Sequence, residues 1–268
     1  MKFAEVAKLR RSEIGHIRER VDSYVVSVPK DALSAILLSG SVGRGDFYPG
    51  RLGGMIDLTV FKKPGSNIAA YELFGENENP EIPFHCVNRN GDWYQIWFSE
   101  MLNGEGFRQL VEARKFDLSE SILLWQRDMT YSDADEVFKG IAAKETMEGY
   151  NERLSKIRYL LSEYKVDRWQ RRKEPEQLHV NLSAAVDLAI GCLYNLNGKY
   201  APAFDRMAYY SYELEIKPTD YGSLLRALMT VKIGSMRSYR NREQAFKTRF
   251  LQFLDESNPP DKSGGPSP

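Results

Sequence analysis

Residues 36–46 read ILLSGSVGRGD, and residues 54–60 read GMIDLTV. The first segment is an apolar run that ends in Gly40-Ser41, and the second is an apolar run with one carboxylate, Asp57, in its middle. Short apolar runs bounded by glycine predict buried strands. Glycine has no Cβ, so the turn between these strands lets backbone N–H groups approach phosphate oxygens. The two segments therefore predict a phosphate-and-metal pocket between neighbouring strands.

Asp57 is the residue of this stretch that is hardest to explain as structure alone. Its neighbours Ile56, Leu58 and Val60 place it in a strand that we expect to be central. Burying a carboxylate without a partner is costly, and a divalent cation held against phosphate oxygens would compensate it. A Gly-Ser dipeptide by itself is more often an ordinary turn, so the interpretation depends on the carboxylate that follows.

The order of these residues resembles the signature of the polymerase-β-like nucleotidyltransferase superfamily, to which the kanamycin-type and minimal nucleotidyltransferases belong. Gly40-Ser41, Arg44-Gly45 and Ile56-Asp57-Leu58 match that signature, and the resemblance covers about residues 30–130. It implies a small mixed sheet with helices and a nucleoside triphosphate bound with Mg²⁺ or Mn²⁺. It also implies transfer of a nucleotidyl group to a hydroxyl of an unknown small-molecule or protein acceptor.

The same resemblance assigns roles to the turn. Asp57 becomes a catalytic and metal-binding carboxylate. The backbone of the turn and one positive charge bind the triphosphate. The residues assigned to this role are Gly40, Ser41, Gly43 and Arg44.

Two of the family's three acidic positions carry other residues here. Met55 stands at the first position and Gln95, in the expected strand 92–98, at the third. Met55 and Asp57 are two apart on a strand and share a face, but a thioether is a poor ligand for Mg²⁺. We therefore expect Asp46, directly after the turn, to act as the second catalytic and metal-binding carboxylate. Asp92 is a weaker candidate, because it belongs to the Asn90-Gly91 hairpin turn.

A polar corner in the second half of the chain, residues 195–202, resembles the Asn-x-x-Tyr-x-Pro corner in the helical domains of some uncharacterised nucleotidyltransferases. By that resemblance, Lys199 or Arg206 contacts phosphate or an acidic substrate. The same residues are also explained as a helix end, with Gly198 in the left-handed conformation and Pro202 starting the next helix. The two interpretations are compatible.

Composition limits the classes of function. The chain has 268 residues, of which 42% are hydrophobic, so it can bury one large core or two modest ones. Lys+Arg and Asp+Glu number 37 each, and this zero net charge leads us to expect no nucleic-acid partner. Cys86 and Cys192 are expected to be buried thiols in a reducing cytoplasm. Without a signal-peptide pattern or a membrane-length apolar stretch, we expect a cytoplasmic protein with no membrane partner.

Strand patterns occur only in the first half of the chain, and helical periodicity dominates the second. This segregation predicts an α+β protein with a nucleotidyltransferase-like mixed sheet and helices in 1–132, an all-helical bundle in 133–256 and a disordered tail in 257–268. Asn90-Gly91 predicts a tight hairpin turn. The expected strands are 35–39, 55–61, 83–88, 92–98 and 121–125. The expected helices are 4–27, 105–115, 134–164, 175–197, 201–215, 219–233 and 239–255.

The run 165–173 interleaves arginines with Trp169. Such a pattern can stack on and neutralise a nucleic acid. In a chain with no net charge it is more often a solvated helix end or linker, which is the interpretation that we favour.

Two functions from different classes fit the sequence. One is a metal-dependent nucleotidyltransferase; the other is a catalytically inactive nucleotide-binding or protein-interaction module derived from the same fold. Met55 and Gln95 favour the second, because neither is a hard anionic ligand. The position of Asp46 relative to Asp57 distinguishes them, since two carboxylates that share a metal must lie close together.

Overall fold

The computed structural model describes residues 3–47 and 54–257. The expected disordered tail therefore lies outside the described residues, apart from its first position. The chain divides into two compact units, Met1–Ile141 and Ala142–Pro268. The long helix α6 (Thr130–Leu160) crosses the division. Each unit is described by itself below.

The first unit contains a five-stranded sheet with the order β3-β4-β2-β1-β5. Its strands are β1 (Leu33–Leu38), β2 (Met55–Lys62), β3 (His85–Arg89), β4 (Asp92–Glu100) and β5 (Ile122–Gln126). Strand β2 pairs parallel with β4 and antiparallel with β1, so the sheet is mixed. With the helices that follow, this confirms the predicted α+β class. Each strand ends within two residues of its predicted bounds.

Apolar runs form the strands of the sheet, and one tight turn joins two of them. All six residues of β1 are buried, as expected of a strand covered on both faces. Strands β3 and β4 form an antiparallel hairpin in which Asn90 (φ 54°) and Gly91 (φ 90°) make the connection. Two positive φ values are typical of a type I′ turn, so the predicted hairpin is confirmed.

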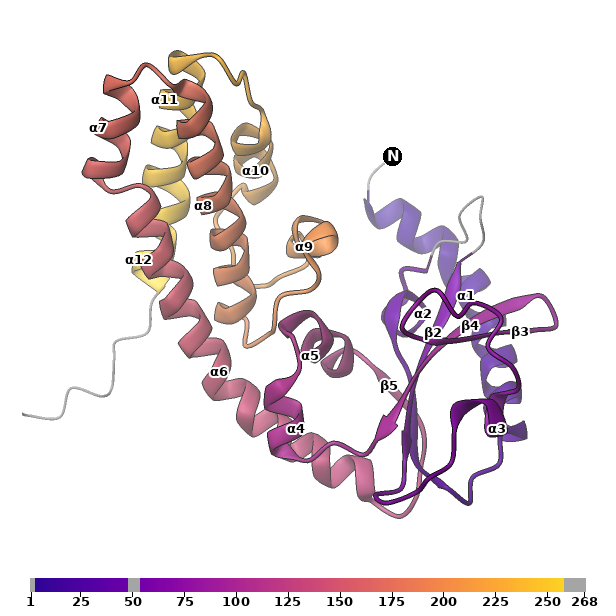
Figure 1. The fold of residues 1–268 in the computed structure, drawn as a ribbon. Helices are drawn as coiled ribbons and strands as arrows, with labels where there is room; N and C mark the ends of the chain where they lie inside the picture. Colours follow the sequence, from indigo (N-terminus) through magenta and orange to yellow (C-terminus); the bar gives the residue numbers. More distant parts are fainter. Residues whose placement is uncertain (1–2, 48–53, 258–268) are drawn as a thin grey trace, which may run out of the picture. The chain divides into compact units, whose positions relative to one another are not determined.

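One face of the sheet carries the hydrophobic core. Helix α1 (Phe3–Ser27) packs on this face through residues such as Val21 and Val25, and α3 (Ala70–Phe74) adds Phe74 (Figure 1). The side chains that β2 and β4 contribute to this core are Ile56, Leu58, Val60, Tyr94 and Ile96. Because side chains alternate along a strand, Asp57 and Gln95 point to the opposite face, where polar groups collect.

Two short helices follow β4 where the sequence predicted one. They are α4 (Gly104–Gln109) and α5 (Glu112–Ser119), separated by Leu110 and Val111 in extended conformation. The Asn103 side chain caps α4 by accepting a hydrogen bond from Gly106 N at 2.8 Å. The break reorients the chain, and α5 brings its polar residues onto the face of the sheet that carries Asp57.

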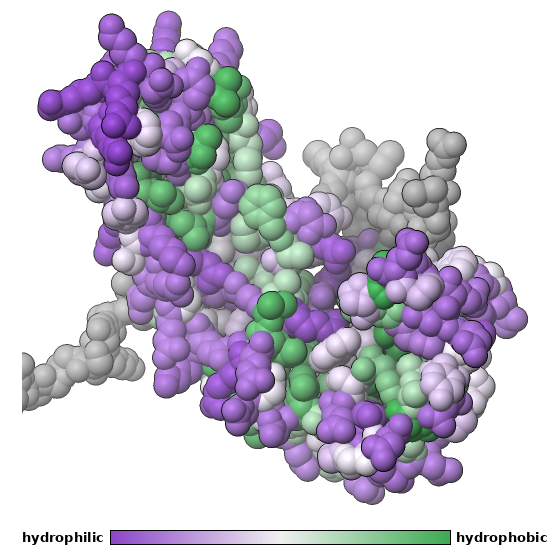
Figure 2. All heavy atoms as spheres, viewed as in Figure 1, coloured by the Kyte–Doolittle hydropathy of each residue, from purple (hydrophilic) through white to green (hydrophobic). Residues whose placement is uncertain are grey.

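All the regular secondary structure of the second unit, among the described residues, is helical. After α6 its helices are α7 (Glu163–Arg171), α8 (Pro175–Leu196), α9 (Phe204–Ser211), α10 (Tyr221–Met229), α11 (Met236–Ala245), the π-helix η1 (Phe246–Leu251) and α12 (Gln252–Ser257). The basic run forms most of α7, which buries none of its residues. The end of the unit that carries α7 is covered mainly by hydrophilic side chains (Figure 2). This placement supports the solvated-helix interpretation of residues 165–173.

Among the described residues, no helix has both the length and the apolar character that a membrane crossing requires. Cys86 and Cys192 are free and buried, as predicted. Burial raises the pKa of the Cys192 thiol to about 12 and also raises that of Cys86.

We predict that neither thiol reacts quickly with Ellman's reagent at pH 8 in the native protein. Thiolate is the reactive form, and burial both blocks access and raises the pKa of each thiol. Both should react once urea unfolds the chain. Val26→Cys, at a position that is 83% exposed, provides the control because it adds one fast-reacting thiol. Rapid modification of the wild type without urea would contradict the packing described here.

Candidate functional site

The predicted glycine turn brings the backbone against the predicted carboxylate. Gly40 begins the short helix α2 (Gly40–Arg44) with φ +63°. A Cβ placed on Gly40 would lie 1.8 Å from Asp57 Oδ2, far inside contact distance. Ser39 N donates to Asp57 O at 2.9 Å, which ties the end of β1 to the start of β2. The sequence analysis expected this backbone to approach phosphate oxygens, which stays a prediction; the group that it approaches in the structure is the chain's own carboxylate.

The register of β2 and β4 places Asp57 and Gln95 side by side. Asp57 pairs with Gln95 across the parallel β2–β4 ladder, and Met55 pairs with Trp93. Cys86 of β3 lies opposite Gln95 on the next strand. Within this part of the sheet, Asp57 therefore has a thioether two positions before it and a neutral amide beside it.

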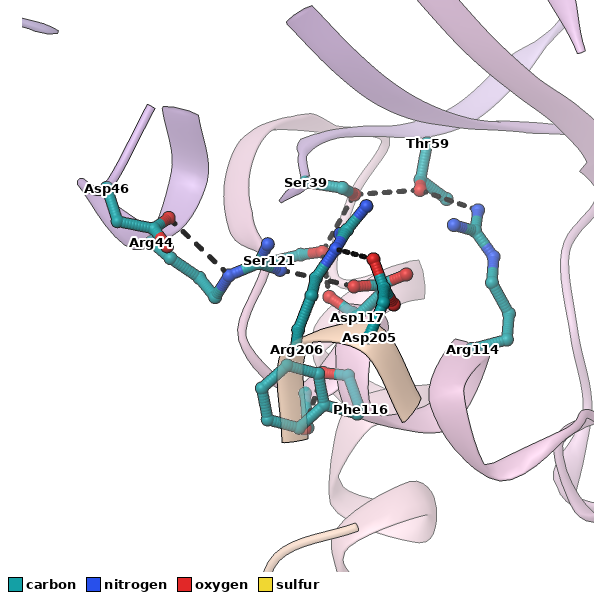
Figure 3. Close-up of polar contacts among 11 residues, drawn as sticks. Ser39, Arg44, Asp46, Thr59, Arg114, Phe116, Asp117, Ser121, Asp205 and Arg206 are labelled. Carbon is teal, nitrogen blue, oxygen red and sulfur yellow. Dashed lines mark hydrogen bonds and ion pairs between the residues drawn. The ribbon is translucent and has the colours of Figure 1, made fainter. Parts of the chain in front are cut away.

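The hydroxyl groups of Ser39, Thr59 and Ser121 form a hydrogen-bonded chain (Figure 3). Ser39 Oγ lies 2.8 Å from both Thr59 Oγ1 and Ser121 Oγ. Arg114 Nη2 donates to Thr59 Oγ1 at 3.0 Å, and Ser121 Oγ donates to Asp117 O at 2.6 Å. A guanidinium can only donate and a carbonyl can only accept. The protons are therefore ordered from Thr59 to Ser39 to Ser121, and each hydroxyl donates once and accepts once.

Arg44, assigned to phosphate from the sequence, lies in an ion-pair cluster. Its side chain is 7% exposed, and its Nη1 donates to Asp117 Oδ1 at 3.1 Å. Its Nε lies 3.7 Å from Asp46 Oδ1 (Figure 3). The guanidinium also lies 5.7 Å from the centre of the Phe116 ring. Arg44 thus links α2 to α5, and its charge is paired with those of Asp46 and Asp117.

Arg114 is the charged residue of this face that the sequence analysis missed. Its guanidinium carbon lies 3.8 Å from the ring centre of Trp97, which pairs with Thr59 across the β2–β4 ladder. Burial lowers the pKa of Arg114 to about 10, and the charges of Asp117 and Asp57 offset only part of that effect. Nothing in the local sequence of α5 marks this arginine, because its position depends on the helix break at Leu110.

The other predicted turn residues have mixed surroundings. Ser41 is half-buried in α2, directly after Gly40. A Cβ on Gly43 would lie 2.6 Å from Leu38 O, so Gly43 is required for α2 to pack against the end of β1.

The polar corner of the second unit is occupied by structural hydrogen bonds. Gly198 has φ +67° and ends α8, as the helix-end interpretation predicts. Asn197 Oδ1 accepts from the backbone of Glu215 and Ile216. Arg206 lies 3.5 Å from Asp205, and both side chains are at least half exposed. Lys199 is exposed in the same unit. A phosphate contact by Lys199 or Arg206 remains a prediction.

The described residues do not form a resident metal site. No group of three or more His, Cys, Asp or Glu side chains is arranged there to hold a metal ion. The charge of Asp46 faces Arg44, and the neighbours of Asp57 are Met55 and Gln95. Asp57 can supply one carboxylate ligand to a cation that arrives with a phosphate ligand, which is a common way for Mg²⁺ to bind.

Comparison with solved structures gives a distant likeness. No family model matches the chain, and no curated protein sequence matches it either. Among solved structures the chain is similar to a nucleotidyltransferase-like protein from Exiguobacterium sibiricum 255-15. The sequence identity is 9% and the TM-score 0.35, over 92% of this chain and 74% of that chain. A likeness of this size does not establish a family, so the interpretation of the site depends on its own residues.

We predict that Gly40→Ala destabilises the protein much more than Gly45→Ala. Both glycines have positive φ, which costs a residue with a Cβ about 1–2 kcal/mol. A Cβ on Gly45 meets nothing within 4 Å, whereas one on Gly40 meets the Asp57 carboxylate. Urea unfolding of the two variants isolates the effect of that contact. Equal losses of stability would show that the backbone and the carboxylate do not approach closely.

We predict that Ser39→Ala lowers the free energy of unfolding by about 1–3 kcal/mol, because it leaves Thr59 without an acceptor and Ser121 without a donor in a buried chain. Ser119→Ala is the matched control, since Ser119 is exposed and bonds only to a carbonyl of its own helix. An effect of Ser39→Ala no larger than that of the control would contradict the ordered hydroxyl chain.

Proposed function

We propose that this protein is nucleotidyltransferase-like and binds a nucleoside triphosphate, together with the triphosphate's Mg²⁺, where β1, α2 and β2 meet. The observation that carries the proposal is the packing of Gly40 against the Asp57 carboxylate, at the join of two adjacent strands. This arrangement places a glycine without a side chain directly against a carboxylate that is only half buried. The order of residues that resembles the nucleotidyltransferase signature lies in the same place.

The residues present suit a triphosphate that brings its own cation. Mg²⁺ commonly binds through one or two protein carboxylates and the phosphates of its substrate, and Asp57 is the carboxylate of this face. Gln95 beside it offers a neutral amide oxygen.

The reaction that we propose to test is transfer of a nucleotidyl group to a hydroxyl of an acceptor. Asp57 would orient the triphosphate through its cation, and the acceptor is unknown. The second candidate is a nucleotide-binding or protein-interaction module without transfer. The pairing of Asp57 with Gln95 and the ion pair between Asp46 and Arg44 favour this candidate, because they leave one carboxylate where paired acids would be needed.

We predict that Asp57→Asn abolishes binding of the Mg²⁺–nucleotide complex and changes the free energy of unfolding by no more than about 1 kcal/mol, because the substitution keeps the shape of a half-buried side chain. Calorimetry with each nucleoside triphosphate and Mg²⁺ measures binding, and pyrophosphate release measures transfer. Asp31→Asn, at an exposed turn position, is the control.

The two candidates separate in this experiment. Binding with pyrophosphate release in the wild type, lost in Asp57→Asn, supports the enzyme. Binding without release supports the module. If the wild type binds none of the nucleotides, or if Asp57→Asn binds them as well as the wild type does, the proposed function is wrong.

A further inference from the structure

The guanidinium of Arg114 is held firmly against the face of the sheet that carries Asp57. Helix α5 brings it over the Trp97 ring, 3.8 Å from the ring centre, and its Nη2 donates to Thr59 Oγ1. Thr59 lies two residues after Asp57 on β2, so both side chains project from the same face. Figure 3 shows the head group of Arg114 pointing toward Thr59.

This guanidinium uses little of its hydrogen-bonding capacity on the protein. An arginine carries five N–H donors, and among the described residues the bond to Thr59 is the one side-chain hydrogen bond that Arg114 makes. Arg114 Nε is buried and has no hydrogen-bond partner there. The Nη1 atom makes no such bond either and, unlike Nε, is not fully buried.

The charge of Arg114 is also only partly compensated. Loss of solvation is the largest influence on its pKa, which falls to about 10, although the charges of Asp117 and Asp57 act in the opposite direction. The acid with the larger influence, Asp117, already accepts a hydrogen bond from Arg44. A cation whose charged form is disfavoured by burial is stabilised when an anion binds to it.

A purely structural role accounts for part of this arrangement. Arg114 starts the hydroxyl chain by donating to Thr59, and one neutral donor there would suffice for that purpose. Burying a charged group costs much more free energy than burying a neutral donor that could make the same single hydrogen bond to a hydroxyl. The remaining donors form a planar fork, which is the geometry that matches phosphate oxygens.

We propose that Arg114 is the anion-binding residue of this face and contacts a phosphate group of a polyphosphate ligand directly. The inference rests on the proposed function and deepens it: Asp57 faces the cation of the ligand, and Arg114 faces the phosphate itself. Binding through Arg114 does not require a divalent cation. The site therefore recognises polyphosphate even when every metal ion is chelated.

The test uses the full chain in EDTA and titrates it with inorganic tripolyphosphate, a probe with neither a base nor a metal. Calorimetry should show binding to the wild type and binding about tenfold or more weaker to Arg114→Gln. Arg114→Lys should give an intermediate affinity, because it keeps the charge and loses the fork. Arg108→Gln, which removes an exposed arginine from the neighbouring helix α4, is the control and should bind as the wild type does.

The outcomes separate this inference from the proposed function. If Mg²⁺–nucleotide and tripolyphosphate bind the wild type and Arg114→Gln equally well, the inference is overturned and the proposed function stands. If tripolyphosphate binds through Arg114 and no nucleotide binds, the inference stands and the proposed function fails. Absence of tripolyphosphate binding to the wild type in EDTA overturns the inference whatever the nucleotide result.

A second measurement covers the case in which Arg114→Gln does not fold. Phenylglyoxal modifies accessible arginines, and peptide mass spectrometry of the wild-type protein locates the modified residues. Tripolyphosphate in EDTA should protect Arg114 and leave Arg108 as reactive as before. Equal reactivity of Arg114 with and without tripolyphosphate would overturn the inference.

Discussion

At the junction of β1 and α2, the Gly40 backbone and the Asp57 carboxylate lie so close that no side chain fits between them. This approach fixes where α2 begins, and Gly43, packed against Leu38 O, fixes how it continues. Ser39, just before the turn, would ordinarily cap a helix with its side chain. Here its hydroxyl is used in the chain from Thr59 to Ser121, and it makes no cap bond. The turn therefore depends on contacts with β2, α5 and the start of β5 more than on its own local bonds.

The ion pairs around this turn could not be predicted from the order of residues in the sequence. Arg44 and Asp46 follow the Gly-Ser turn directly. Arg44 forms ion pairs with Asp46 and with Asp117. Removing one member of a buried ion pair commonly costs about 3–5 kcal/mol, so with a side chain only 7% exposed Arg44 contributes to stability. The cation with spare donors on the sheet face is Arg114, which lies far from the turn in sequence and close to Asp57 in space.

The sequence predicted the parts of the structure that depend on local patterns. Apolar runs located every strand, and the positive φ values of Asn90 and Gly91 follow from residue types that tolerate them. The resemblance alone associated Gln95 with Asp57, and the pairing of β2 with β4 places the two side by side.

What the sequence missed depends on tertiary contacts. A single helix was expected for 105–115, because the helical period runs through Leu110 and Val111, yet both are extended in the structure. That break decides where Arg114 lies. The sequence also did not predict the ion pair of Arg44 with Asp117, since the two residues are 73 positions apart along the chain. Charge pairing over such separations is set by packing, and no periodicity encodes it.

The residues beside Asp57 also affect which charge a ligand of this face must carry. Carboxylates clustered on one face repel one another until a cation binds. With Met55 and Gln95 as its neighbours, Asp57 has no second carboxylate at these positions, and the nearby charge of Arg114 is of opposite sign. Burial disfavours the charged guanidinium, which an anion would stabilise. A ligand that binds only the folded state adds stability by mass action, so the anion that we propose for this face would take the stabilising role that a cation has at a cluster of acids.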